Sequence, residues 1–152
     1  MNVVLDRDFT IIKDSHIQGF GLFDKKTIPK GTRILEYEGK RVLKENLIAD
    51  LVAGLTTLRY VMNLTETTVI DAEREGNDAR FINHSCKPNC IIYFFDNTPY
   101  IYALQEIPIG NELSFDYQMG TTNPESLTEQ QKRDILPCNC GSKNCRGTLL
   151  SN

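Results

Sequence analysis

Three cysteines near the end of the chain, Cys138, Cys140 and Cys145, have the short spacing of metal ligands. Zn²⁺ prefers four ligands in tetrahedral geometry, and a C-x-C-x4-C turn supplies several of them from one tight segment. One ligand is then missing, and Cys86 is the best-placed candidate to complete the set. We therefore predict a zinc site that ties the C-terminus to the middle of the chain.

A disulfide or a set of buried thiols is the alternative for these cysteines. We favour a metal because five cysteines is an odd number, and because Met1 leads straight into ordinary folded sequence without a signal peptide. The expected surroundings are intracellular and reducing. Cys90 is the expected spare, a small core residue before the apolar run of residues 91–95.

Composition predicts one globular domain with a real core, since 40% of the 152 residues are apolar and 24% are charged. No apolar stretch approaches the length of a membrane span, so no membrane partner is expected. A net charge of −3 and a pI near 5.4 argue against a nucleic-acid binder. This mild acidity suits either a basic partner, such as a lysine-rich peptide, or an ordinary surface.

The elements that must position these residues are mostly short strands rich in β-branched and aromatic residues. The expected strands are residues 3–5, 9–13, 33–38, 91–95, 100–104 and 112–117. Residues 96–99 predict a hairpin loop. Segments 28–31 and 107–110 both place Pro and Gly as a type I turn prefers.

Two helices are expected. Apolar residues at helical spacing predict an amphipathic helix over residues 44–55; they are Leu47, Ile48, Leu51, Val52 and Leu55. Ser126 and Glu129 predict a capping box for a second helix that runs to about residue 136. Residues 118–125 are expected to link the strands to the cysteine cluster.

Other motifs are weak when each is taken alone. Gly19-Phe20-Gly21 is either a simple tight turn or a ligand contact, and His84 is either a core histidine or part of a site. In this order along the chain, however, the motifs resemble the SET-domain protein lysine methyltransferases, in a trithorax-like pattern without a pre-SET region. They are segments 19–23, 36–39, 69–72, 76–90 and 112–117, Tyr60, and the cysteine cluster, which resembles the family's post-SET module.

The resemblance covers residues 15–149 and implies a mainly β fold. The expected SET fold has small curved β-sheets around a C-terminal pseudoknot, few short helices and a zinc-bound post-SET tail. In the pseudoknot, the segment after Tyr117 passes through a loop near Asn83 and His84. The expected divisions are a SET domain in 1–117, a linker with a short helix in 118–137 and a post-SET zinc module in 138–152.

The resemblance also implies S-adenosylmethionine as methyl donor, S-adenosylhomocysteine as product, and a lysine-containing basic peptide, in particular a histone tail, as substrate. Transfer of a sulfonium methyl to a neutral amine needs positioning and no covalent intermediate. Only about one lysine in 2,500 is neutral at pH 7. An apolar, aromatic channel beside a sulfonium cation lowers the lysine pKa, so no histidine base is required.

Three aromatic residues match the family's catalytic positions. Tyr117 matches the catalytic tyrosine, and Tyr60 matches the residue that contacts donor and lysine channel. The alternatives are a strand-end tyrosine anchored by one hydrogen bond for Tyr117 and a core aromatic for Tyr60. Phe115 matches the phenylalanine/tyrosine switch, where phenylalanine leaves room for a methylated amine and predicts di- or trimethyl-lysine. Tyr37 is either a wall of the lysine channel or a packing residue.

Donor binding is implied for a set of matched positions, with Arg80 as a buttress of the Asn83-His84 pair and Asn139 near the adenine. The set is Gln18, Gly19, Phe20, Gly21, Tyr60, Arg80, Asn83, His84, Tyr117, Asn139 and Leu149. Gln18 and Phe20 stand where trithorax-like members often carry more polar or basic residues. In this scheme the metal module forms one wall of the donor and lysine sites.

Three functions compete on the sequence. The first is a histone methyltransferase, located in the nucleus in a eukaryote. The second applies the same chemistry to a non-histone protein, in the cytoplasm or as a secreted effector. The third is a catalytically silent SET scaffold or reader, which would be expected to lose Tyr117, the Asn83-His84 pair or the cysteine cluster; all are present.

Overall fold

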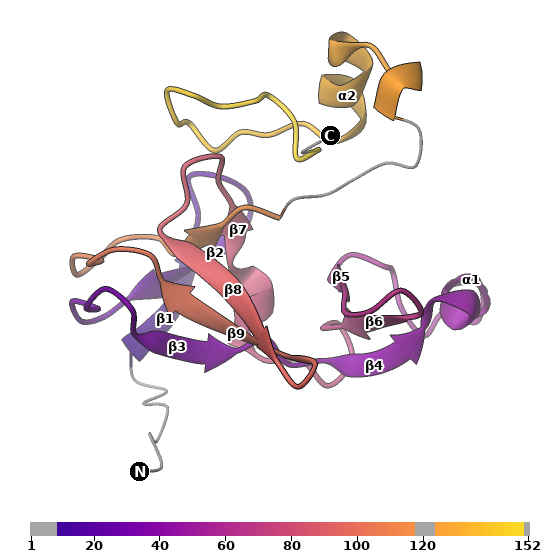
Figure 1. The fold of residues 1–152 in the computed structure, drawn as a ribbon, viewed down its shortest axis with the longest axis horizontal. Coiled ribbons are helices and arrows are strands. Elements are labelled where there is room, and N and C mark those ends of the chain that lie inside the picture. The colour runs from indigo at the N-terminus through magenta and orange to yellow at the C-terminus, as the bar shows by residue number, and fades with distance from the viewer. Residues whose placement is uncertain (1–8, 118–123, 151–152) are drawn as a thin grey trace.

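The strands form four small sheets rather than one continuous sheet (Figure 1). The structure is a computed structural model that describes residues 9–117 and 124–150. Its sheets pair β1 (Thr10–Asp14) with β2 (Phe20–Asp24), β3 (Arg33–Glu36) with β9 (Thr98–Ala103) and β8 (Cys90–Phe95), β4 (Lys40–Leu43) with β6 (Thr68–Asp71) and β5 (Val61–Asn63), and β7 (Asn83–His84) with β10 (Ser114–Phe115). The predicted mainly β fold is confirmed.

The expected strands are confirmed in part. Strands β1, β3, β8 and β9 occur close to their predicted places. The strand predicted over residues 112–117 is wrong in extent, because only Ser114 and Phe115 pair, in parallel, with the two residues of β7. Residues 3–5 lie outside the described part of the chain. Strands β2, β4, β5, β6 and β7 were not expected from composition.

The hairpin between β8 and β9 is tighter than predicted. Asp96 and Asn97 both adopt left-handed backbone conformations, with φ of 50° and 59°. A two-residue hairpin loop of this kind requires positive φ at both positions, which Asp and Asn tolerate. Thr98 and Pro99 therefore belong to β9, where they pair with Phe95 and Phe94.

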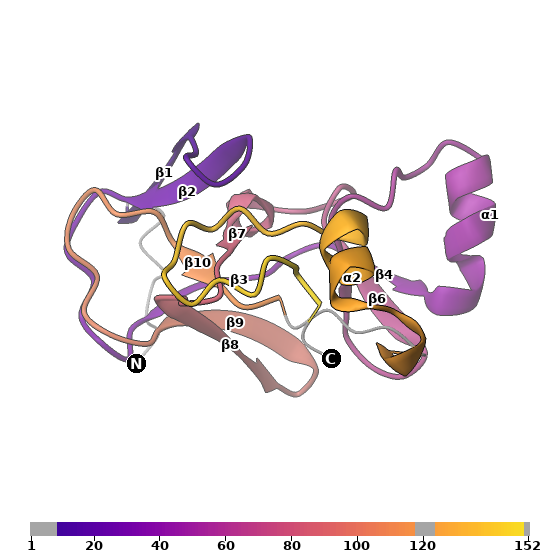
Figure 2. The ribbon, with the colours of Figure 1, turned by 90° about the horizontal axis from the view of Figure 1, so that it is seen from above.

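The first predicted helix exists but is shorter and does not pack. A 3-10 turn, Lys44–Asn46, leads into α1 (Leu47–Val52), and Gly54 at φ 75° follows its end. None of the residues of α1 is buried. The predicted apolar face is exposed, with Val52 at 82%, and α1 lies at the edge of the molecule (Figure 2).

The second helix, α2 (Glu129–Ile135), has a different cap from the one predicted. Thr128, not Ser126, is the N-cap, and its hydroxyl accepts a hydrogen bond from the Gln131 amide at 3.1 Å. The Gln131 side chain accepts one from the Thr128 amide in return. Ser126 instead ends the 3-10 turn Pro124–Ser126.

The core draws on all four sheets and on the turns between them. The largest fully buried apolar side chains are Leu22, Ile28, Ile70, Ile82, Ile101, Ile107, Leu113 and Val69. The similar turns 28–31 and 107–110 meet here, since Ile28 and Ile107 exchange backbone hydrogen bonds of 2.9 and 2.8 Å. In the described ranges, no helix has both the length and the apolar character that a membrane span requires.

The parallel pair β7 and β10 brings together two segments that are distant in sequence. Both lie beneath the C-terminal segment in Figure 1, where the yellow trace runs over their ends. After α2, an isolated antiparallel β-bridge joins Pro137 to Thr148 and closes the C-terminal segment into a loop. The predicted threading after Tyr117 falls on residues 118–123, outside the described ranges.

Candidate functional site

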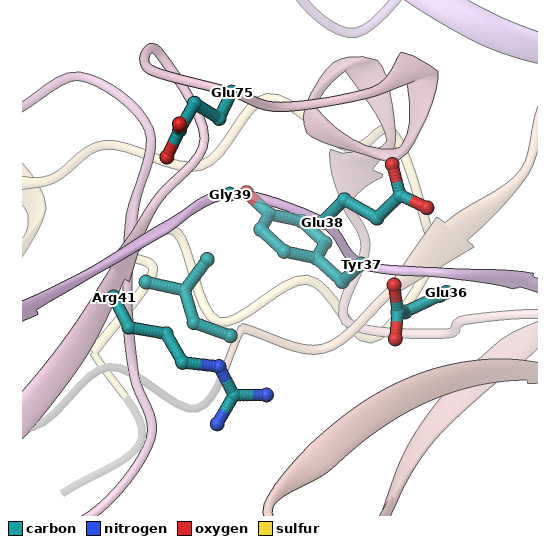
Figure 3. Close-up of a pocket in the computed structure, with 7 residues that line it drawn as sticks. Glu36, Tyr37, Glu38, Gly39, Arg41 and Glu75 are labelled. Atoms are coloured by element: carbon teal, nitrogen blue, oxygen red, sulfur yellow. The ribbon is translucent and has the colours of Figure 1, made fainter.

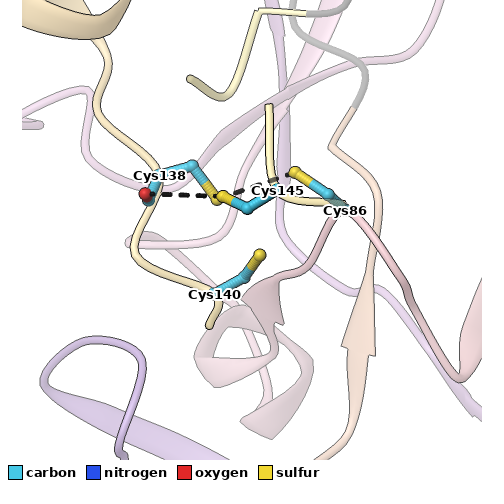
Figure 4. A group of neighbouring side chains, drawn as sticks. All are labelled: Cys86, Cys138, Cys140 and Cys145. Atoms are coloured by element: carbon cyan, nitrogen blue, oxygen red, sulfur yellow. Dashed lines mark hydrogen bonds between the residues drawn. The ribbon is translucent and has the colours of Figure 1, made fainter. Parts of the chain in front are cut away.

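Four cysteines gather between the end of β7 and the C-terminal segment. The sulfur atoms of Cys86, Cys138, Cys140 and Cys145 all lie within 4.8 Å of one another, and Figure 4 shows them turned toward a common centre. A tetrahedral Zn²⁺ with bonds of about 2.3 Å holds its sulfurs about 3.8 Å apart. The Cys86 and Cys138 sulfurs are 3.8 Å apart, so the donor set and its spacing fit the ion.

The thiol chemistry of this cluster also favours a metal over a disulfide. All five cysteines are free, and bonded sulfurs would be about 2.05 Å apart. Burial raises the pKa of Cys86 and Cys138, whereas hydrogen bonds led by the Ser142 hydroxyl outweigh burial at Cys140 and lower its pKa to about 5. Cys90 stays apart as predicted, fully buried, with its pKa raised by burial to about 12.

His84 connects this cluster to Tyr117. The Tyr117 amide donates to His84 Nδ1 at 3.1 Å, so Nδ1 is an acceptor and the ring proton belongs on Nε2. Nε2 lies 3.4 Å from the Cys86 sulfur. Burial lowers the pKa of His84, which favours this neutral form. His84 therefore orients the Cys86 sulfur and the Tyr117 backbone, and its geometry does not suit a general base.

Tyr117 is held in place at both its backbone and its ring. Its hydroxyl donates to the Ile82 carbonyl at 2.5 Å. Its ring centroid lies 4.8 Å from that of Phe115 and 5.3 Å from that of His84. Burial raises the pKa of the Tyr117 phenol, so the hydroxyl stays protonated and can donate.

Six of the predicted donor-binding residues surround one small pocket between the SET-like core and the C-terminal segment. The pocket is lined by Ile17, Gln18, Asn83, His84, Tyr117, Pro137, Cys138, Asn139 and Leu149. Chain segments far apart in sequence thus converge on one site. The enclosed space measures about 40 Å³, roughly the room that one or two waters occupy.

The Asn83 amide fixes the glycine loop at the rim of this pocket. Its nitrogen lies 3.1 Å from the Gln18 carbonyl and 3.0 Å from the Phe20 carbonyl. It is also 2.9 Å from the Glu112 carboxylate, which accepts a 2.6 Å hydrogen bond from the Ser15 hydroxyl. The asparagine side chain therefore positions the loop, and its nitrogen is already occupied by protein acceptors.

Three predicted donor-binding residues lie away from this pocket, besides Gly19 and Gly21. Phe20, Tyr60 and Arg80 do not line the pocket. They surround Phe81 instead: its ring lies 6.4 Å from that of Phe20 and 6.2 Å from that of Tyr60, and the Arg80 guanidinium lies 4.7 Å above it. Arg80 also donates to the Ala72 carbonyl at 3.4 Å, which fits the predicted buttress.

A second, larger pocket lies beside Tyr37 and measures about 220 Å³. Its lining is Glu36, Tyr37, Glu38, Gly39, Arg41, Ile70 and Glu75 (Figure 3). Burial and the charge of Glu38 raise the pKa of Glu36. The charge of Arg41 opposes this shift, but three glutamates against one arginine make the lining predominantly acidic.

Comparison with known proteins assigns the family. A family model described as the SET domain matches residues 19–118. The chain belongs to the SET-domain family. This SET domain begins at the glycine loop and ends just after Tyr117, so the matched region contains the Asn83-His84 pair, and the C-terminal cysteines lie beyond it.

Relatives of this SET-domain chain include proteins named histone-lysine N-methyltransferase. Histone-lysine N-methyltransferase trithorax of Drosophila virilis is 35% identical over 151 residues, which cover 94% of this chain and 4% of the relative. Histone-lysine N-methyltransferase SETD1B of Homo sapiens is 34% identical, over 89% of this chain and 7% of the relative. Histone-lysine N-methyltransferase, H3 lysine-4 specific, of Chaetomium globosum is 37% identical, over 89% and 12%. The chain thus spans a small part of these relatives.

Sequence reasoning missed two residues that build the SET-domain site, Ser15 and Glu112. Their bond joins positions 97 apart in the sequence, and no local pattern points to it. Gly21 lies beside this bond, since a Cβ at this glycine would meet the Glu112 carboxylate oxygen. Glycine is needed there for close approach.

We expect Gly21→Ala to destabilise the protein by about 1–3 kcal/mol, because the added methyl displaces a carboxylate that Ser15 and Asn83 hold. Urea denaturation of the single and double variants measures this. Glu112→Ala removes the obstacle, so the double variant Gly21→Ala/Glu112→Ala should lose less stability than the two single losses added together. Simple additivity would contradict the steric explanation.

Proposed function

We propose that this chain is a protein-lysine N-methyltransferase that uses S-adenosylmethionine and acts on a histone tail. The observation that carries the proposal is the convergence of Tyr117, the Asn83-His84 pair and the C-terminal segment on one pocket. The names of the relatives support the activity and the histone substrate. A nuclear location follows if the substrate is a histone.

The donor pocket is proposed to accept the methyl donor beside Tyr117. S-adenosylmethionine supplies a sulfonium methyl group. Backbone carbonyls and amides of the glycine loop and the Asn139 side chain offer hydrogen-bonding groups suited to an amino-acid end and an adenine. The space enclosed by these residues is about 40 Å³, which is smaller than a whole donor molecule, so part of the donor is proposed to extend beyond it.

Tyr117 is proposed to orient the substrate amine. Its pKa is raised by burial, so the phenol stays protonated at neutral pH and cannot take the amine's proton. Its hydrogen is donated to the Ile82 carbonyl, which leaves the hydroxyl oxygen to accept a hydrogen bond from the amine. Tyr37 is similar, with a pKa raised by burial to about 12. The lysine proton is therefore expected to leave to solvent, favoured by the cost of a second cation in an aromatic site.

The acidic pocket beside Tyr37 supports a basic peptide as substrate. Tyr60 and Tyr37 are both electrostatic neighbours of Tyr117, so this pocket adjoins the proposed lysine site. Glu36, Glu38 and Glu75 line it with Arg41 as the one basic residue among the lining side chains. Negative charge at the approach to a lysine site raises the local concentration of cationic segments.

Zinc is the metal proposed for the four cysteines, in a post-SET module of residues 138–152 joined to the SET domain in 1–117 by residues 118–137. Four thiolates in tetrahedral arrangement are a closed structural site. The ion would hold Cys138 and Cys140 on either side of Asn139, and thereby hold one wall of the donor pocket. Its proposed role is structural, with no contact to the reacting atoms.

Incubation of the zinc-loaded chain with methyl-labelled S-adenosylmethionine tests the proposal. Intact histones and a protein extract are offered as separate substrates, and mass spectrometry identifies the modified lysines. Labelled lysine on a histone supports the proposal in full. Labelling of another protein alone would overturn the histone substrate, and absence of labelled lysine in both would overturn the activity.

Phe115 is proposed to set the degree of methylation. Its side chain is 7% exposed and packs on Tyr117, where a hydroxyl could hold a water against a methylated amine. We expect the wild type to form di- or trimethyl-lysine and Phe115→Tyr to stop mainly at monomethyl-lysine, as read by product mass over time. Phe94→Tyr, on the exposed outer strand β8, is the control and should leave the product unchanged. An unaltered product distribution in Phe115→Tyr would refute this role.

A further inference from the structure

Arg146 lies between the cysteine cluster and the strand that carries Tyr117. Its guanidinium forms a two-pronged ion pair with Asp116, with Nη1 2.8 Å from Oδ2 and Nη2 3.1 Å from Oδ1. Asp116 directly precedes Tyr117 in the chain. The guanidinium therefore holds the side chain of the residue next to the proposed catalytic tyrosine.

The same guanidinium also contacts Leu149, another residue that lines the proposed donor pocket. Nη2 donates to the Leu149 carbonyl at 3.3 Å, and both Leu149 and Tyr117 line the pocket. The Arg146 guanidinium thus connects Asp116, which precedes Tyr117, with the backbone of Leu149. Lysine could not reproduce this, because an ammonium is a point charge without the fixed fork of a guanidinium.

The backbone around Arg146 forms hydrogen bonds with the cysteine cluster. Its amide donates to the Cys86 sulfur at 3.4 Å, and the next amide, of Gly147, donates to the Cys145 sulfur at 3.3 Å. Amide hydrogen bonds to a ligating sulfur fix the ligand and its surroundings. Arg146 consequently contacts the cysteine cluster through its backbone amide, and the residues around the proposed donor pocket through its side chain.

The ion pair between Arg146 and Asp116 is partly buried. The side chains of Arg146 and Asp116 are 29% and 23% exposed, so their pair is only partly screened by solvent. Asp116 Oδ1 is also 3.6 Å from His84 Nδ1. The carboxylate therefore sits where the cluster, the histidine and the tyrosine strand meet.

We propose that Arg146 is a positioning residue that sets the spacing of the donor-pocket walls and so couples the state of the cysteine cluster to donor affinity. This inference rests on the proposed function for the identity of the ligand. Arg146 touches neither the donor nor the reacting atoms. It acts through Asp116 on Tyr117 and through the carbonyl of Leu149.

Calorimetric titration of the zinc-loaded chain with S-adenosylhomocysteine tests the proposal, with metal content and thermal unfolding measured on the same samples. Arg146→Lys keeps the charge and the backbone amide but loses the fork, so we expect about a 10-fold weaker affinity with the metal retained. Asp116→Asn should weaken affinity by a similar factor. The double variant should be no weaker than the single variants, because both changes break one connection.

Arg33→Lys is the matched control, an exposed arginine on β3 that also donates a side-chain hydrogen bond, to Tyr102, and lies outside both pockets; it should bind as the wild type does. Unchanged affinity in Arg146→Lys would overturn the positioning role alone, and so would additive losses in the double variant. Loss of metal in step with affinity would make the role merely structural and also overturn it. Failure of the wild type to bind the probe would overturn both this inference and the proposed donor site.

Discussion

Replacing Tyr117 with phenylalanine is expected to slow methyl transfer by roughly 100-fold without loss of the fold. The change removes only the hydroxyl that donates to the Ile82 carbonyl and leaves the ring contacts with Phe115 and His84 available. The Tyr117 backbone amide still donates to His84. Single-turnover transfer from labelled donor, at saturating donor and peptide, measures the rate of the chemical step.

The matched control is Tyr93→Phe, which removes a hydroxyl from a half-exposed tyrosine on β8, outside both pockets. It should transfer methyl groups at the wild-type rate. Donor affinity of Tyr117→Phe should stay within a few-fold of wild type, since the ring remains. Equal rates for Tyr117→Phe and wild type would exclude the hydroxyl from the reaction.

Removal of the proposed zinc ion is expected to weaken donor binding strongly while most of the β-sheet core stays folded. The cluster fixes Cys138, Cys140 and Cys145 on the C-terminal side and only Cys86 on the other, whereas the fully buried apolar residues lie in the sheets and their turns. Cys140→Ser, and separately a chelator, should lower bound zinc from one ion per chain to near zero. Donor affinity should fall at least about 10-fold.

Elemental analysis, calorimetric titration with S-adenosylhomocysteine and far-ultraviolet circular dichroism together measure these effects. Cys90→Ala is the control, since Cys90 lies in the core apart from the cluster. It should cost some stability and leave the zinc content at one. Global unfolding on chelation would contradict a separable module, and normal donor binding by metal-free protein would contradict its role as a wall.

The cysteine cluster and much of the pocket proposed for the donor were predictable because their signals are chemical. The spacing of Cys138, Cys140 and Cys145 restricts what thiols can do, and Cys86 was the best-placed candidate to complete the set. The structure brings these four sulfurs together. It also places Asn139 and Leu149 beside Tyr117, as the resemblance to SET domains implied, and the family is confirmed.

Composition could not predict strands that form only by pairing with a segment distant in the sequence. The two-residue strands β7 and β10 exist only because each finds the other, and propensity cannot mark segments so short. Periodicity did find α1, yet its apolar side stays in solvent, because amphipathic spacing states that a face is apolar and not what covers it. The cap of α2 moved to Thr128 because its extended backbone, with φ −73° and ψ 162°, suits an N-cap.

The bond between Ser15 and Glu112 joins positions 97 apart, and this has a consequence for biogenesis. On the ribosome, the first of these two residues emerges many seconds before the second at usual elongation speeds. Pairings with such large sequence separation pay a loop-closure entropy and form late in folding. The Ser15–Glu112 contact beside the glycine loop therefore cannot form on the ribosome before residue 112 has emerged, whereas the hairpin of β1 and β2 needs only residues that are close in sequence.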